Sequence, residues 1–262
     1  MTKPRIYHPH DMEEGVVYNL GRNHLHYLKR VLRTNVGNTL ILFDGSGNEY
    51  DGIVRQLSDR NVRVEIVKKT LCAEEDLHDV TLLQALPKGS KMDLIVQKTT
   101  ELGVGKIIPF VSERSVPKMS PAKGIERVAR WQTIALEATR QSGRVSAPEI
   151  GEIHSFREVI RSAGGAKVRI IFWEEETRTS LRELIENGEV GQAKDLAIVI
   201  GPEGGFSRDE VMEAREAGYK SASIGTKILK VDTAAIATLT IIQYTRGFFD
   251  SKKREGGPQN GL

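Results

Sequence analysis

Between residues 1 and 70, short apolar stretches alternate with polar residues, a pattern typical of β-strands. It predicts strands at 40–44, 50–57 and 62–67, with a hairpin turn at the DGSGN sequence of residues 44–48. Residues 24–33 differ, because their leucines and valine fall on one helical face and predict an amphipathic helix. Residues 1–72 therefore predict a small β domain.

From Val80 onward, apolar runs of strand length alternate with stretches of helical period. Strands that alternate with helices predict an α/β fold with a mostly parallel sheet. Ser90 and Ser207 each precede an acidic residue at the spacing of a capping box, so helices are expected to start there. The predicted strands span 80–86, 106–111, 168–173, 196–200 and 221–224, and further helices span 121–140 and 233–249.

The segment 233–249 is apolar on nearly all sides, so the last helix is expected to be buried. It should begin near Asp232 or Thr233, and Asp232 could serve as its N-cap. The acidic stretch 73–79 predicts a linker between a first domain, 1–72, and a second, 80–249. Residues 250–262 are polar and glycine-rich, which predicts a disordered tail.

Two small-residue loops, at 201–205 and 225–229, each follow a predicted strand of the second domain. Ligands bind at the carboxyl ends of the strands in open α/β sheets. One glycine loop alone could be a plain turn, but two in succession favour a ligand site. Neither loop has the Gly-Lys-Ser/Thr of a P-loop or the G-x-G-x-x-G of a dinucleotide turn, which argues against a nucleotide-binding enzyme.

Charge and cysteine content narrow the classes of protein further. The net charge is only +3, but residues 80–147 carry 11 Lys and Arg against 5 Asp and Glu, a modest nucleic-acid signal that ordinary solvated faces could also explain. The single cysteine, Cys72, excludes an internal disulfide and fits a cytoplasmic protein. No apolar run reaches membrane-spanning length, and no secretory signal is evident. His24 and His26 diverge on a helix, so no metal site is expected.

Two segments carry residues suited to RNA. Arg5 and Tyr7 combine a cation with an aromatic ring, which suits phosphate contact and base stacking. Arg140, Gln141 and Arg144 surround Gly143 at the end of a predicted helix. Cations there could contact RNA, or could simply complement the helix dipole.

The sequences IGPEGGFS at 200–207 and IGTKILKVDTA at 224–234 resemble the paired terminal motifs of the SPOUT methyltransferases. More narrowly, they resemble the RsmE-type 16S rRNA uridine-N3 methyltransferases, and the resemblance spans residues 3–249. It implies a C-terminal trefoil knot, a PUA-like N-terminal barrel, a homodimer and S-adenosylmethionine as cofactor. The chain departs from the family pattern at Arg140, where Glu is usual, and at Lys230 and Asp232, where the family commonly has Arg and Glu.

The resemblance also implies roles for individual residues. The expected cofactor-binding residues are Phe172, Ile200, Gly201, Pro202, Glu203, Gly204, Gly205, Ile224, Gly225, Ile228, Leu229 and Thr233. The expected RNA-binding residues are Arg5, Tyr7, Arg22, Lys29, Arg30, Arg33, Lys88, Arg114, Gln141 and Arg144. The implied partners are 16S rRNA in the small ribosomal subunit and a second copy of the chain.

Methylation at N3 of uracil requires loss of the N3 proton, so the site needs a base or cations that stabilise the uracilate. Arg144, Lys230 and Asp232 are the expected catalytic residues, with Lys88 and Glu203 as further candidates. The alternative is a non-catalytic RNA-binding or ribosome-assembly factor that keeps the fold.

Overall fold

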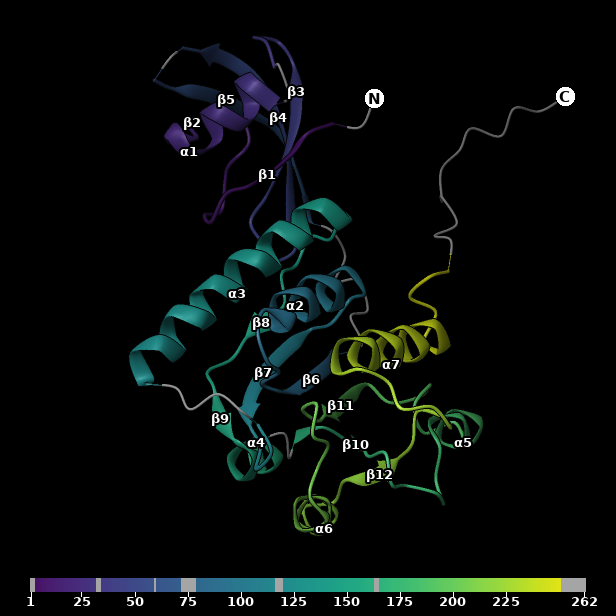
Figure 1. The fold of residues 1–262 in the computed structure, drawn as a ribbon. Coiled ribbons are helices and arrows are strands. Elements are labelled where there is room, and N and C mark those ends of the chain that lie inside the picture. The colour runs from purple at the N-terminus through teal and green to yellow at the C-terminus, as the bar shows by residue number, and fades with distance from the viewer. Residues whose placement is uncertain are drawn as a thin grey trace, which may run out of the picture.

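Two separate β-sheets organise the chain (Figure 1). The computed structural model describes residues 3–31, 34–58, 60–71, 79–115, 120–162 and 165–250. The predicted linker at 73–79, apart from Asp79, and the predicted tail, apart from Asp250, lie outside these residues.

The first sheet has five strands in the order β1-β3-β4-β5-β2. Only β1 and β3 are parallel, and the other neighbours are antiparallel. The hairpin turn at 44–48 is confirmed, since Asp44 accepts hydrogen bonds from the backbone amides of Ser46 and Asn48 at 2.8 and 3.2 Å. The strands are β1 Arg5–Tyr7, β2 Val17–Asn19, β3 Thr39–Phe43, β4 Asn48–Leu57 and β5 Val62–Leu71.

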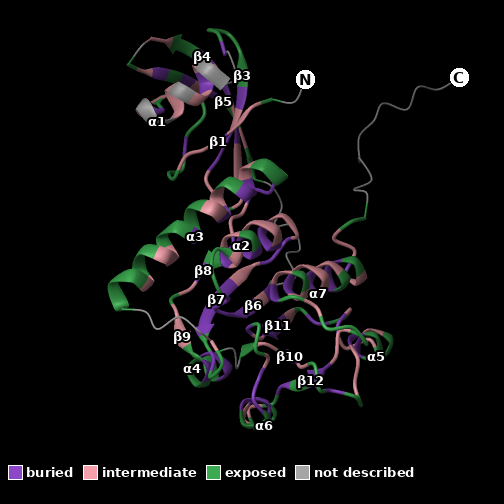
Figure 2. Cartoon of the chain, viewed as in Figure 1, coloured by how far each residue is buried: buried purple, intermediate pink, exposed green. Residues whose placement is uncertain are grey.

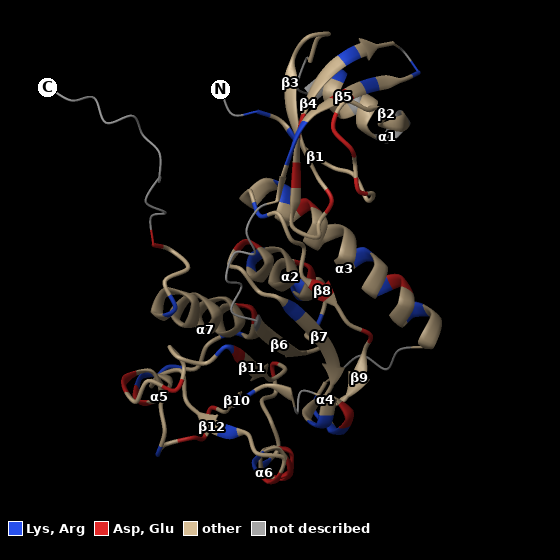
Figure 3. Ribbon diagram, turned by 180° about the vertical axis from the view of Figure 1, so that it is seen from behind, with Lys and Arg blue, Asp and Glu red and all other residues tan. Residues whose placement is uncertain are grey.

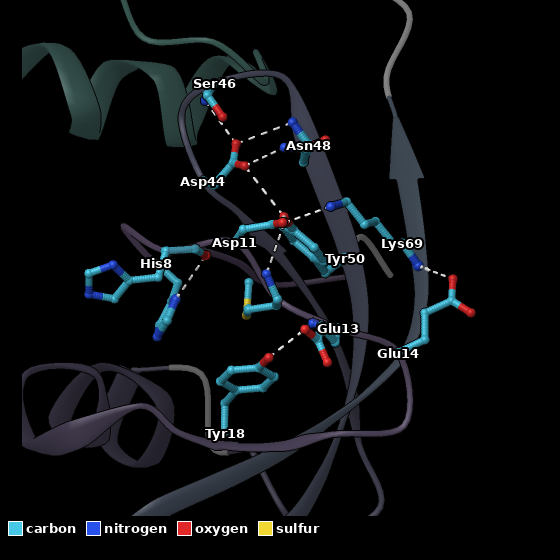
Figure 4. A network of polar contacts seen from close by, with 12 residues as sticks. His8, Asp11, Glu13, Glu14, Tyr18, Asp44, Ser46, Asn48, Tyr50 and Lys69 are labelled. Atoms are coloured by element: carbon cyan, nitrogen blue, oxygen red, sulfur yellow. Dashed lines mark hydrogen bonds and ion pairs between the residues drawn. The ribbon is translucent and has the colours of Figure 1, made fainter.

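A polar network closes one end of this sheet (Figure 4). Asp11 accepts hydrogen bonds from the Tyr50 hydroxyl and, at 2.6 Å, from Lys69 Nζ. The Lys69 and Tyr50 hydrogen bonds lower the pKa of Asp11, while burial and the bond to Asp11 raise the pKa of Tyr50. The network thus ties the loop after β1 to β4 and β5.

The single helix predicted at 24–33 is wrong in detail. The α-helix α1 runs over Gly21–His26, and a π-helical turn, η1, follows at Tyr27–Val31. The Leu28 side chain is buried in the core formed with the first sheet, as its position on the apolar face predicts. The helical hydrogen-bond pattern changes from α to π at Tyr27. The Tyr27 hydroxyl accepts a hydrogen bond from Arg140 of the second domain.

The second sheet confirms the predicted parallel α/β fold. Its order is β12-β10-β11-β6-β7-β8, all neighbours are parallel, and β9 pairs with β7. The apolar run of β11 is buried on both faces, as expected for a central parallel strand. The strands are β6 Asp79–Ala85, β7 Lys106–Val111, β8 Glu149–Ile150, β9 His154–Ser155, β10 Val168–Phe172, β11 Asp195–Ile200 and β12 Lys220–Ala222.

Helices cover both faces of this sheet. Residues of α2, α3, α5 and α7 form one core with it, and residues of α4 and α6 form another. The helices are α2 Lys91–Glu101, α3 Pro121–Ser142, α4 Phe156–Ser162, α5 Leu181–Glu186, α6 Arg208–Glu216 and α7 Val231–Thr245.

Helix starts follow the sequence signals only in part. The capping box at Ser207 is confirmed, and a second one at Ser180 was missed. Helix α2 starts after Ser90 as predicted, but the capping-box bonds are wrong, because the Asp93 carboxylate instead accepts hydrogen bonds from Arg130 and from the Trp131 ring nitrogen.

The last helix, α7, begins earlier than predicted. Lys230 is its N-cap, in extended conformation, and Asp232 therefore lies in the first turn. One face of α7 is buried, but Ile241 is 38% exposed and Tyr244 is 74% exposed (Figure 2). Burial on all sides is therefore wrong for the single chain.

Candidate functional site

The two glycine loops meet at one cavity of about 450 Å³ at the carboxyl edge of the second sheet. The loops follow β11 and β12, and the end of β10 lies between them because β10 separates these strands in the sheet. Parallel strands bring their carboxyl ends to one edge, which is why segments far apart in sequence line one site. The lining residues are Phe172–Glu174 (FWE), 200–205 (IGPEGG), 223–231 (SIGTKILKV) and Ala234.

Gly205 explains why the first loop requires glycine. Its φ is +66°, and a Cβ atom there would lie 1.8 Å from Glu174 Oε1. Its amide donates to the Pro202 carbonyl at 3.0 Å, which closes the turn. Any side chain would therefore both strain the backbone and displace the Glu174 carboxylate.

Glu203 holds the same loop against the start of α2. Its carboxylate accepts from the Lys88 amide at 3.2 Å and from Lys91 Nζ at 2.6 Å. Burial opposes ionisation, but the bonds from Lys91 and from backbone amides outweigh it and lower the pKa of Glu203. An ionised, fully engaged carboxylate is a poor proton acceptor, so Glu203 is a positioning residue in this geometry.

Arg114 braces the loop from the opposite side, donating from Nη1 to the Gly204 carbonyl at 2.9 Å. The Lys88 and Arg114 side chains are exposed. These two predicted RNA-binding residues therefore lie beside the loop that lines the cavity, and their contact with RNA stays a prediction.

A buried polar cluster supports the wall formed by Trp173. Glu176 is 8% exposed and accepts hydrogen bonds from Ser221 and, at 2.7 Å, from Arg215. Burial opposes ionisation, but the bonds from Ser221, the Arg178 amide and Arg215 lower the pKa of Glu176. The Arg215 guanidinium lies 5.9 Å from the centre of the Trp173 ring and so orients it toward the site.

Most of the predicted cofactor residues line the cavity, and Lys230 joins them there. Thr233 is exposed and does not line it, so its contact with the cofactor stays a prediction. Asp232 is not a lining residue either, and its Oδ1 atom is buried without a hydrogen-bond partner among the described residues. Sequence reasoning missed Trp173, Glu174, Ser223, Val231 and Ala234. The rule that strand ends carry the site could have found the first two.

Arg144 does not line the cavity, and its catalytic and RNA-binding roles stay predictions. It is 4% exposed, and its Nη1 atom donates to the carbonyls of Thr100 and Val104 at 2.7 and 3.0 Å. Carbonyls at a helix end attract a cation, and here the end of α2 holds the guanidinium. Arg144 therefore joins the ends of α2 and α3 and has almost no surface left for RNA.

The remaining predicted RNA-binding residues are dispersed. Arg5 and Tyr7 lie in β1 where the two domains meet, Gln141 is exposed at the end of α3, and Lys29 is half-buried in η1. The Arg22 and Arg30 side chains and all of Arg33 lie outside the described residues. No metal-binding group of three or more His, Cys, Asp or Glu is found in the part of the chain that the structure describes.

Comparisons with known proteins agree with this architecture. A model of the RNA methyltransferase domain matches residues 73–243, and a model of the RNA methyltransferase PUA domain matches residues 20–67. The ribosomal RNA small subunit methyltransferase E of Bacillus subtilis (strain 168) is 30% identical over 248 residues, which cover 93% of this chain and 94% of that protein.

Solved structures place the cofactor in similar proteins. A methyltransferase from Legionella pneumophila, in complex with S-adenosylmethionine, superposes with a TM-score of 0.84 at 30% identity over 93% of this chain and 98% of that one. The ribosomal RNA small subunit methyltransferase E of Neisseria gonorrhoeae, bound to S-adenosylmethionine, superposes with a TM-score of 0.82, with the same identity and coverage.

An all-parallel sheet with paired loops at its carboxyl edge, preceded by a PUA-like domain, makes this chain an RNA methyltransferase of the SPOUT class. Full-length similarity narrows the class. The chain belongs to the ribosomal RNA small subunit methyltransferase E family, the RsmE family. Of the helices described, none has the length and apolar character to cross a membrane.

Proposed function

We propose that this chain transfers the methyl group of S-adenosylmethionine to N3 of a uridine in 16S rRNA of the small ribosomal subunit. The observation that carries the proposal is the cavity between the two glycine loops, in a fold shared with two relatives solved with S-adenosylmethionine. Its volume of about 450 Å³ lies in the range of small-molecule sites.

The residues present fit this cofactor. Apolar side chains of Phe172, Ile200 and Leu229 offer a surface for its ring, and the glycines leave backbone amides and carbonyls open to its polar groups. The ring nitrogen of Trp173 is buried without a partner among the described residues, so one donor in the wall awaits an acceptor. When bound, the cofactor supplies a methyl group on a positively charged sulfur.

Lys230 is the best placed catalytic group. It lines the cavity at the N-cap of α7 and is exposed, so its ammonium group can stabilise the negative charge that forms on uracil O2 or O4 as the N3 proton leaves. Asp232, two residues on, does not line the cavity, so the N3 proton leaves to solvent water and not directly to this carboxylate. The new bond joins N3 to the methyl carbon while the bond from carbon to sulfur breaks.

A homodimer is part of the proposal. The outer face of α7 leaves Ile241 and Tyr244 exposed, and Ile228, 88% exposed, projects from the second loop. Of these apolar groups only Ile228 lines the cavity, and all three suit a second copy of the chain, whose surface would cover them.

RNA binding is proposed for the first sheet and α3. Figure 3 shows lysine and arginine on both, and the excess of basic residues lies in 80–147. A basic face attracts the phosphate backbone without reading its sequence.

Methyl transfer from labelled S-adenosylmethionine to small subunits that lack the modification tests the function. We expect N3-methyluridine when the product nucleosides are analysed by mass spectrometry. Label on another atom would retain the methyltransferase class and refute the N3 assignment. Absence of both transfer and cofactor binding would leave the RNA-binding factor as the function.

A further inference from the structure

A second cavity, of about 390 Å³, lies between the two domains. It is enclosed by three elements: β1 and the α1–η1 segment of the first domain, and α3 of the second. It shares no lining residue with the cavity at the glycine loops. Its lining residues are Arg5, Ile6, Tyr7, His24, Tyr27, Thr133, Leu136, Glu137 and Arg140.

Contacts with Tyr27 and Glu137 fix the planar guanidinium of Arg140 in this cavity. Its guanidinium lies 4.8 Å from the centre of the Tyr27 ring, and Nη1 donates to the Tyr27 hydroxyl at 2.7 Å. Nε and Nη2 donate to Glu137 at 3.1 and 2.8 Å. A guanidinium has five N–H groups, so two retain no partner among the described residues. The side chain is fixed in place and still has donors to offer.

Arg5 faces the same space from β1. It pairs with Glu49, and its Nη2 donates to the Arg144 carbonyl at 2.9 Å. Its Nε atom is buried and has no partner in the described part of the chain. Arg5 from β1 and Arg140 from α3 both line the cavity with fixed guanidinium groups, which makes it a built site for an acceptor-rich ligand.

The aromatic residues set the shape of that ligand. Tyr7 and Tyr27 both line the cavity, and Tyr7 packs on Gly45, which has φ +79° and would place a Cβ 3.2 Å from the tyrosine ring. Flat aromatic rings with guanidinium donors suit a planar base that carries hydrogen-bond acceptors. A duplex cannot enter a cavity of about 390 Å³, whereas a single unpaired nucleotide can.

We propose that this cavity binds one unpaired nucleotide of the RNA substrate, outside the uridine that is methylated. The inference rests on the proposed function for the identity of the RNA. Because the two cavities share no lining residue, the cavity between the domains binds the RNA independently of the cofactor. The nucleotide stacks on Tyr7 or Tyr27, and Arg5 and Arg140 donate to its base edge or phosphate.

Two variants with matched controls test the site. Arg140→Glu reverses the charge, and Arg182→Glu makes the same change at an exposed position of α5, outside the sheet and the helix proposed for RNA. Thr133→Trp fills the cavity without altering Arg140, since the Thr133 hydroxyl bonds only to the Ala129 carbonyl of its own helix. Gln132→Trp adds the same bulk at the adjacent, exposed position outside the cavity. Glu is the residue that the resembling motif has at position 140, so we expect the fold to accommodate it.

We expect Arg140→Glu and Thr133→Trp to raise KM for small subunits at least tenfold. The affinity for S-adenosylmethionine, kcat and Tm should stay close to wild type, and the two controls should change KM less than twofold. Unchanged KM in both cavity variants, or an equal rise in the controls, would overturn the proposal.

Ultraviolet cross-linking supplies a readout that needs no methyl transfer. The protein is irradiated with small subunits and digested, and the cross-linked peptides are mapped by mass spectrometry. We expect cross-links at Tyr7 or Tyr27 that Thr133→Trp removes and Gln132→Trp retains. Cross-links confined to other regions would refute the site. If the wild-type protein forms these cross-links but does not methylate small subunits, the proposed function is refuted and the nucleotide site is not.

Discussion

Gly205 and Glu174 approach so closely that a single methyl group on the glycine would lie 1.8 Å from the carboxylate oxygen. The glycine loop after β11 is therefore fitted to the end of β10, and the shape of the cavity depends on the absence of one side chain.

The first prediction concerns that contact. Gly205→Ala should raise the Kd for S-adenosylmethionine roughly 10- to 100-fold, because alanine at positive φ costs about 1–2 kcal/mol and Glu174 must move as well. Isothermal titration calorimetry measures the change. Gly165→Ala, at a position with open space and ordinary φ, is the control. Equal affinities for the two variants would contradict this account of the loop.

Lys230 supplies the second prediction. Lys230→Ala should lower kcat about 100-fold with little change in cofactor affinity, because the ammonium group acts only as charge develops on the base. Single-turnover methyl transfer, with cofactor binding measured separately, resolves the two effects. Lys227→Ala removes a neighbouring cation of the same cavity and should leave kcat within a few-fold of wild type. The assignment fails if both variants lose kcat equally.

Arg144 should behave as a structural residue. Arg144→Ala removes two hydrogen bonds from a buried cation and should lower the free energy of unfolding by about 2–4 kcal/mol. Urea denaturation gives the value. Methylation by the remaining folded protein should be close to normal. A stable Arg144→Ala protein that binds the cofactor but does not methylate would restore the catalytic role expected from sequence.

The stability of the fold should depend on pH through Glu176. Its pKa is lowered in the folded protein, so its ionised form stabilises the fold above the ordinary glutamate pKa of about 4.3, and this contribution is lost as the pH falls through the lowered value. Glu176→Gln should therefore be less stable than wild type at pH 7, by about 1–2 kcal/mol since Arg215 is half exposed. The difference should shrink on acidification, as thermal unfolding at stepped pH would measure. A difference that is constant from pH 7 to pH 4 and below would exclude the charge as its cause.

The outer face of α7 predicts the oligomeric state. Tyr244→Asp should convert a dimer to a monomer, because a charge buried in an apolar interface loses its hydration. Sedimentation velocity distinguishes the two. Ile125→Asp, on the 72% exposed Ile125 of α3, should leave the dimer intact. A wild-type monomer at micromolar concentration would refute the proposed dimer.

Sequence patterns predicted the parallel sheet well because its strands are buried on both faces and are read as uninterrupted apolar runs. They missed β8 and β9, since two-residue strands carry no periodicity. The Ser90 capping box failed for a tertiary reason, as Arg130 and Trp131 of α3 take the Asp93 carboxylate.

The position of the candidate site could be predicted to the extent that it follows from the order of strands and loops along the chain. Glycine loops after successive strands indicated the cavity, and most of the residues predicted to bind the cofactor line it. Arg144 could not be placed from sequence. The sequence shows a cation at the end of one predicted helix, but it does not show that the guanidinium donates to a carbonyl at the end of another helix, α2. The cavity between the domains could not be foreseen, because it needs β1, η1 and α3 in contact.

The order of strands also bears on synthesis. Strand β11 pairs along its whole length with β6, and the second glycine loop and α7 come last in the domain. The first sheet can form while the ribosome is still making the second domain, since domains fold as units from the N-terminus. The cofactor cavity, in contrast, cannot exist until residues up to about 234 have emerged. A nascent chain can thus complete its first sheet before it is able to methylate anything.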